Sequence, residues 1–150
     1  MIAIFIRTTD EGINDMETAM KENNLKPIAR LVSYAAAGVP PRIMGIGPVA
    51  AIPKVLKQAG MNLNDIDLVE LNEAFASQSL ACIRDLRINP DIVNVNGGAI
   101  AIGHPLGCSG ARIIVTLINV LKQNGGKIGA AGICNGGGGA SAMIIENIPS

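Results

Sequence analysis

The chain alternates short apolar runs with longer segments in which apolar residues recur at helical spacing. The short runs predict strands at residues 2–6, 28–37, 67–71, 127–134 and 140–146, with an extended piece at 92–95, and the longer segments predict helices at 10–24, 47–59, 72–86 and 109–123. This alternation favours an α/β fold, here a mixed, mostly parallel five-stranded sheet with helices on both faces. The last two strands, joined by Gly136 to Gly139, form a C-terminal hairpin that makes one strand antiparallel. Pro53 should bend or shorten its helix.

The composition excludes several classes of partner. A length of 150 residues suits a single domain spanning residues 1–150. The net charge is zero and only three residues are aromatic, so we expect no nucleic-acid partner. No apolar stretch is long enough to span a bilayer, and residues 2–6 lack the flanks of a signal peptide, so we expect no membrane partner. The three cysteines are interpreted as reduced thiols, and the predicted location is cytoplasmic.

Hydrophobic residues make up 49% of the chain, and its mean hydropathy is +0.38. Two explanations remain open. A sheet covered by helices on both faces contains near-continuous apolar strands. Alternatively, another protein segment normally covers one apolar face, in which case the chain alone should form a homo-oligomer or bind a partner.

The only histidine, His104, lies in the segment GGAIAIGHPLGCSGAR at residues 97–112. The glycines allow the backbone to approach a ligand closely, and Pro105 restricts His104 to extended geometry. A helical pattern begins at Ser109, so the imidazole is held on a stiff loop at a helix entrance, where reactive groups are often found. A lone histidine is more often a packed core residue, but the motifs elsewhere in the chain favour catalysis.

Other positions could take part in catalysis or ligand binding, or could have only a structural role. Asn72 lies between a strand and a helix, where ligand sites of α/β sheets collect, although it could simply cap the helix. Cys134 ends a strand before a run of glycines whose N–H groups could stabilise an oxyanion. Its thiol could move a proton if neighbours bring its pKa toward neutrality, or it could be a buried small residue. The turn at residues 44–48 could contact a ligand or only form the turn. Cys82 fits core packing, and nothing in its spacing marks Cys108 as a nucleophile.

The sequence lacks the motifs of metal sites and of phosphate-binding loops. A zinc site needs about four ligands at short spacings. Three scattered cysteines and one histidine do not supply them, so we expect no metal ion. No glycine-rich run is followed by the Lys and Ser/Thr of a phosphate-binding loop.

Four motifs occur in a characteristic order: MGIGPVAAI at residues 44–52, NEAF at 72–75, the His104 segment, and CNGG at 134–137. In this order and spacing the chain resembles the C-terminal domain of thiolases, the family of acetyl-CoA acetyltransferases and 3-ketoacyl-CoA thiolases. The resemblance is strong from about Lys26 to Ile145 and loose over residues 1–25. It implies a thiolase-like α/β fold and acyl transfer between acyl-CoA and coenzyme A, by Claisen condensation or by thiolysis. The CoA thioester is the substrate, and no cofactor is implied.

The resemblance implies a role for each matching residue. His104 corresponds to the histidine that activates the nucleophilic cysteine and helps to bind the thioester oxygen. Asn72 corresponds to the asparagine that holds a water molecule in the first oxyanion hole. Cys134 corresponds to the second cysteine, which exchanges a proton with the acetyl methyl group, and the Gly136 N–H to a donor of the second oxyanion hole. Chemistry of this kind on a thioester needs a base and such donors.

The resemblance also implies a substrate contact and a missing part. Met44 and Phe75 match residues near the acyl group and pantetheine. Thiolases carry the nucleophilic cysteine in an N-terminal domain, and no segment here matches that cysteine's motif. We therefore expect the chain alone to be inactive and to need an N-terminal thiolase half or a partner subunit. The alternative is a non-catalytic thiolase-like module that binds acyl-CoA or a partner subunit.

Overall fold

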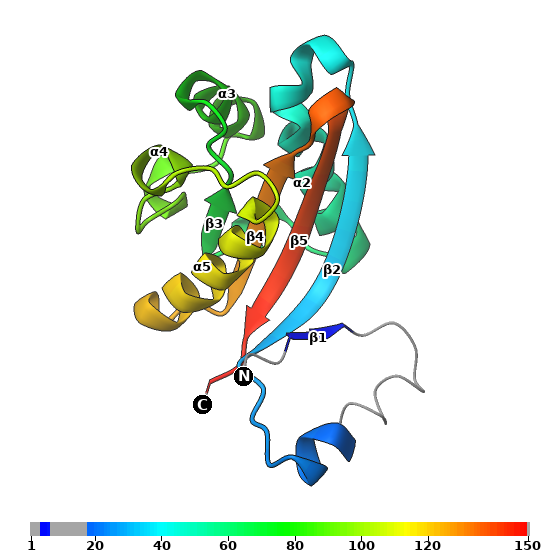
Figure 1. Ribbon diagram of the computed structural model, residues 1–150, viewed down its shortest axis with the longest axis vertical. Helices are drawn as coiled ribbons and strands as arrows, with labels where there is room; N and C mark the ends of the chain where they lie inside the picture. The colour runs from blue at the N-terminus through cyan, green and yellow to red at the C-terminus, as the bar shows by residue number, and fades with distance from the viewer. Residues whose placement is uncertain (1–3, 7–17, 150) are drawn as a thin grey trace.

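The computed structural model describes residues 4–6 and 18–149 of the chain, and five strands form one sheet in the order β1-β2-β5-β4-β3. The strands are β1 (Ile4–Ile6), β2 (Ala29–Gly38), β3 (Leu68–Leu71), β4 (Ile128–Cys134) and β5 (Gly139–Asn147). β1 pairs in parallel with β2 and β3 with β4, whereas β5 is antiparallel to β2 and to β4. The sheet is therefore mixed, with only the last strand reversed, and the predicted α/β class is confirmed (Figure 1).

Helices cover both faces of this sheet, as the sequence predicts (Figure 1). Helix α5 (Ser109–Asn124) packs on one face, and α2 (Gly47–Ala59) with α3 (Ala76–Leu86) packs on the other. The short helices are η1 (Pro41–Ile46), η2 (Leu63–Asp65), η3 (Pro90–Ile92), α4 (Ala99–Ile102) and η4 (Gly136–Gly138), and residues 18–22 are also helical. Within the described residues, no helix combines the length and the apolarity needed to cross a membrane.

Two hydrophobic cores result, one on each face, and neighbouring residues of β5 supply both. Ile144 lies in the core beneath α2, and Ile145 lies in the core beneath α5; each is fully buried. Burial of a side chain of this size stabilises the fold by about 1.5–3 kcal/mol. In β2 the register shifts between Leu31 and Ser33, which pair with Ile145 and Ile144, respectively. Beyond this bulge, the side chains of β2 exchange the two faces of the sheet. Leu31 therefore faces α5, whereas Ala35, four residues later, faces α2.

Proline and glycine set the limits of α2 as expected. Pro48 lies in its first turn, and Gly60 adopts a left-handed conformation with φ of 67° just beyond its end. The Gly60 N–H donates to the carbonyl groups of Leu56 and Lys57. The helix continues through Pro53 to Ala59, so Pro53 does not shorten it.

Three other boundaries differ from the sequence-based expectations. The helix predicted from residue 72 begins at Ala76, because the Asn72 N–H donates to the Gly132 carbonyl group (2.9 Å) and prolongs the pairing of β3 with β4. Asn72 is therefore not a helix cap. The extended piece at 92–95 is reduced to one parallel bridge between Val93 and Val69, and the short helix α4 was not predicted. Residues 10–17 of the helix predicted at 10–24, and residues 2–3 of the first predicted strand, lie outside the described residues.

We expect Gly129→Ala to destabilise the fold by about 1–3 kcal/mol, because it overpacks the contact between β4 and α5. A Cβ at Gly129 would lie 2.6 Å from Leu117 Cδ1 and 2.9 Å from its Cγ, and Leu117 is fully buried. Urea denaturation measures the free energy of unfolding. Gly38→Ala is the matched control, since a Cβ there meets nothing within 4 Å; equal stability of the two variants would contradict this packing.

Candidate active site

The predicted site residues gather around the carboxyl ends of β3 and β4. These strands are parallel neighbours, so they end at the same edge of the sheet. Asn72 follows β3 directly, and Cys134 is the last residue of β4. The loop between α4 and α5 carries His104 over the same edge (Figure 1). Ligand sites of α/β sheets form at such edges.

The structure brings the Asn72 and His104 side chains into direct contact. Asn72 is fully buried, and its Nδ2 lies 3.4 Å from His104 Nε2. On the other side of the ring, His104 Nδ1 lies 2.6 Å from the Oγ of the buried Ser109, which also bonds to the Pro105 carbonyl group (3.2 Å). Ser109 is the first residue of α5, so the helix itself fixes the orientation of the imidazole. Sequence reasoning missed this role of Ser109, although the serine lies inside the His104 motif.

The donors around the imidazole assign its tautomer. Asn72 presents an amide N–H to Nε2, so this nitrogen accepts the hydrogen bond. The hydrogen of the neutral ring then resides on Nδ1 and is donated to Ser109, which passes its own hydrogen to the Pro105 carbonyl group. A ring held in this way keeps a basic lone pair on Nε2 at the sheet edge. The Asn72 Oδ1 is buried and has no partner among the described residues, so it can accept a bond from a polar ligand.

Cys134 and Gly136 lie at the same edge but outside this hydrogen-bonded set. No described hydrogen bond joins the Cys134 side chain to His104 or Asn72. Burial raises the pKa of the Cys134 thiol above its ordinary value, so the group is protonated at neutral pH. Gly136 is the exposed first residue of η4, with Gly137 at φ of 84° beside it. Cys82, expected in the core, is fully buried.

A buried acid behind the site was not predicted as functional. Glu70 is completely buried in β3, and burial raises its pKa to about 7, against the opposing effect of the Arg112 guanidinium and with a further small increase from Glu73. Neither Glu70 oxygen, nor any guanidinium nitrogen of Arg112, has a hydrogen-bond partner among the described residues. A glutamate inside the apolar run LVEL was the available signal in the sequence.

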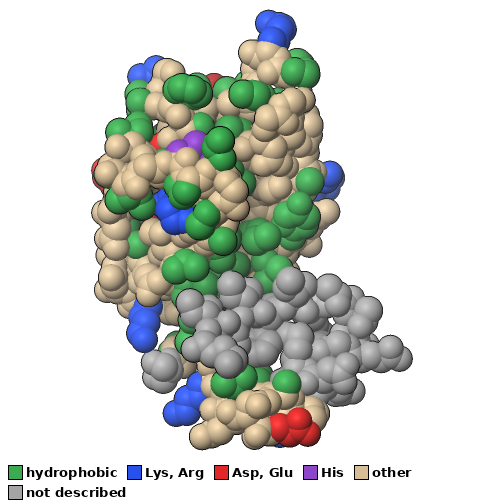
Figure 2. All heavy atoms as spheres, in the orientation of Figure 1, with side chains coloured by type: hydrophobic (Ala, Val, Ile, Leu, Met, Phe, Trp, Pro, Cys, Tyr) green, Lys and Arg blue, Asp and Glu red, His purple; other side chains and the backbone are tan. Residues whose placement is uncertain are grey.

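The surface around His104 is apolar. Figure 2 shows several hydrophobic side chains near the single histidine, among backbone atoms and a few charged side chains. The exposed apolar residues of this region include Leu106 (83% exposed), Ile100 (62%) and Ile102 (60%). The predicted substrate contacts are exposed as well: Phe75 at 70% and Met44 at 41%. They lie on neighbouring elements, since Gly45 packs against Gln78 and bonds to Cys82 of α3.

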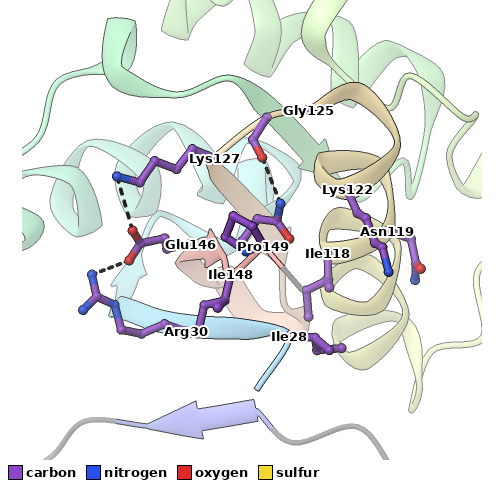
Figure 3. A pocket seen from close by; sticks show the side chains of 12 residues that line it. Ile28, Arg30, Ile118, Asn119, Lys122, Gly125, Lys127, Glu146, Ile148 and Pro149 are labelled. Carbon is purple, nitrogen blue, oxygen red and sulfur yellow. Dashed lines mark hydrogen bonds and ion pairs between the residues drawn. The ribbon is translucent and has the colours of Figure 1, made fainter. Parts of the chain in front are cut away.

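Two cavities flank α5 at opposite ends. A groove of about 350 Å³ lies beside the His104 loop and is lined by Leu106, Ile113, Ile133 and Tyr34 among others. A larger cavity of about 740 Å³ lies beyond the end of α5, where Arg30 and Lys127 pair with Glu146 (Figure 3). The larger cavity is at the far end of the sheet from His104, so it is not part of the candidate site. No group of three potential metal ligands occurs among the described residues.

Comparisons with known proteins show what this chain is similar to. Residues 25–147 match the family model described as the thiolase C-terminal domain. The chain is 50% identical over 145 residues to the acetyl-CoA acetyltransferase of Escherichia coli K12, covering 91% of this chain and 37% of that protein. It is 54% identical over 132 residues to a cytosolic acetyl-CoA acetyltransferase of Gibberella zeae, covering 88% of this chain and 33% of that protein.

Two solved structures show the same fold. The acetyl-CoA acetyltransferase of Bacillus anthracis superposes with a TM-score of 0.85 at 50% identity, covering 88% of this chain and 34% of that one. Human mitochondrial 3-ketoacyl-CoA thiolase in complex with CoA gives the same TM-score at 52% identity, with coverage of 89% and 34%. The chain thus spans about a third of the length of these relatives.

We expect Glu70→Gln to flatten the pH dependence of stability between about pH 4.5 and 7. In this window the unfolded chain releases the Glu70 proton whereas the folded chain retains it, so wild-type stability falls as the pH rises. In the variant, the fall in the free energy of unfolding across this pH window should be smaller by about 1–3 kcal/mol. Urea denaturation at pH 5 and pH 8 measures it, with Asp85→Asn, an exposed acid on α3, as control. An unchanged slope in Glu70→Gln would contradict the assignment.

Proposed function

Because the chain belongs to the thiolase C-terminal domain family, we propose that it supplies the base and the oxyanion-binding groups for acyl transfer between acyl-CoA and coenzyme A. The contact between Asn72 and His104 carries this proposal, since it places Nε2 of the imidazole at the sheet edge beside an amide. A thiol nucleophile needs such a base, and the thioester oxygen needs polar groups where its charge develops.

Each residue has a proposed step. His104 Nε2 takes the proton of the nucleophilic thiol and then donates it to the thioester oxygen. Asn72 Oδ1 holds a water molecule that donates the second hydrogen bond to this oxygen. The raised pKa of Cys134 keeps its thiol protonated, which suits it to protonating the carbanion released in thiolysis; the reverse transfer serves condensation. The Gly136 N–H acts as a donor to the second oxyanion. Met44 and Phe75, both exposed near this edge, contact the acyl group and pantetheine.

The proposal includes a partner segment. The relatives are about three times as long as this chain, and the apolar surface around His104 is open. We assign an N-terminal thiolase segment, bearing the nucleophilic cysteine, to this surface. The relatives carry both cytosolic and mitochondrial names, so the cytoplasmic location stays a prediction.

Reconstitution tests the proposed function. The chain is mixed with the N-terminal segment of the Escherichia coli relative, and thiolysis of acetoacetyl-CoA is followed. We expect no turnover from either part alone and measurable turnover from the mixture. His104→Ala in the mixture should lower kcat by about 10²–10⁴-fold, because the base is removed.

Two results would overturn the proposal. Turnover by the chain alone would show that the nucleophile lies within it. A mixture that forms a stable complex and binds CoA without turnover would identify a non-catalytic module instead.

The open surface also predicts self-association when the N-terminal segment is absent. Leu106→Asp should shift the chain toward monomer in sedimentation velocity runs, with stability changed by less than about 0.5 kcal/mol because Leu106 is exposed. Gln58→Asp, on the exposed side of α2, adds the same charge elsewhere and serves as control. A wild-type chain that stays monomeric across a wide concentration range would contradict this prediction.

A further inference from the structure

The residue next to Asn72 connects two parts of the chain that are distant in sequence. Glu73 is half-buried, and its Oε1 accepts a hydrogen bond from Asn94 Nδ2 (2.9 Å). Its Oε2 accepts one from the backbone N–H of Ile100 (3.0 Å), in the first turn of α4. A single carboxylate thus ties the end of β3 to the segment that leads to His104.

Asn94 completes this connection from the other side. Its Oδ1 accepts from the Leu71 N–H and its Nδ2 donates to the Leu71 carbonyl group, both at 2.9 Å. The second hydrogen of the amide goes to Glu73. Asn94 has a φ of 49°, a left-handed conformation that asparagine tolerates better than most residues. Asn94 and Glu73 therefore fasten both ends of the same short segment to β3.

The backbone of Gly98 lies directly against this carboxylate. A Cβ at Gly98 would overlap the carboxyl group of Glu73. Gly98 immediately precedes α4, so the absence of a side chain there allows Glu73 to reach the Ile100 N–H. Gly98 has a φ of −111°, which other residues also adopt, so the backbone conformation does not require a glycine here. The close approach of the carboxylate does.

Packing alone holds α4 only weakly. The helix has four residues, of which only Ala99 is buried, and Ile100 and Ile102 are about 60% exposed. A helix this short is not stable by itself in water. Gly103, with φ of 92°, follows α4 and leads directly to His104. The ion pairs of the described residues lie elsewhere, on Glu146, so the Glu73 charge acts on this segment rather than on a cation.

We propose that Glu73 is a positioning residue for His104: its carboxylate holds α4 against the end of β3, so that the imidazole meets Asn72 and Ser109 in one tautomer. The relevance to acyl transfer rests on the proposed function. The position of the ring does not, since it can be measured without substrate.

The single histidine makes the test direct, because long-range ¹H–¹⁵N NMR spectra of the 150-residue chain contain one imidazole. In the wild type we expect hydrogen on Nδ1 and a lone pair on Nε2. Glu73→Gln leaves one acceptor oxygen for the two N–H groups of Asn94 and Ile100, so one of the two hydrogen bonds is lost. The ring should then show the mixture of tautomers of an unrestrained imidazole. Gly98→Ala should do the same by displacing the carboxylate. Ser109→Ala, which removes the direct partner, gives the reference for a released ring.

Asp91→Asn is the matched control, since it neutralises an exposed carboxylate on the same segment and should retain the wild-type pattern. If Glu73→Gln and Gly98→Ala both fold and keep the hydrogen on Nδ1, the proposal is overturned. If Glu73→Gln loses its dispersed amide spectrum, Gly98→Ala decides alone, because it leaves the charge in place. Acyl transfer in the reconstituted mixture is a separate measurement, so failure of the proposed function and failure of the positioning role remain distinguishable.

Discussion

The pairing of β5 between β2 and β4 is the interaction on which the rest of this structure depends. It joins two pairs of parallel strands into one sheet, and its neighbouring side chains enter opposite cores. Helices on both faces then bury these side chains, which accounts for much of the high hydropathy of the chain. The exposed isoleucines and Leu106 around His104 are not accounted for in this way, and they are the basis for assigning a partner to that surface.

The candidate site combines rigid and weakly packed parts. Asn72 is fixed by the ladder between β3 and β4, and Ser109 by the start of α5. His104 lies between them on a loop whose preceding helix, α4, has few packing contacts. Polar contacts therefore determine where the imidazole lies, and this gives Glu73 and Asn94 more influence on the site than their distance from the reacting atoms suggests.

The three polar residues near the end of β3 show how neighbouring positions acquire different roles. Glu70 faces the α5 side without a hydrogen-bond partner, and burial raises its pKa. Asn72 is equally buried but meets His104. Glu73 is half-buried and satisfied by one side-chain and one backbone N–H group. The surroundings of each group, rather than its residue type, decide its charge and its contacts.

The sequence by itself determined the class of fold and the order of the strands and longer helices, because hydrophobic periodicity and glycine or proline positions are local signals. Its motifs also singled out Asn72, His104 and Cys134, whose catalytic roles stay predictions. The boundaries of α2 and α5 follow from such signals. Only the tertiary structure decided that Asn72 continues the sheet instead of capping a helix, since its partner Gly132 is remote in sequence. The same holds for the contacts of Glu73 and for the burial of Glu70, because hydrogen bonds between distant segments and the loss of solvent leave no periodic signal along the chain.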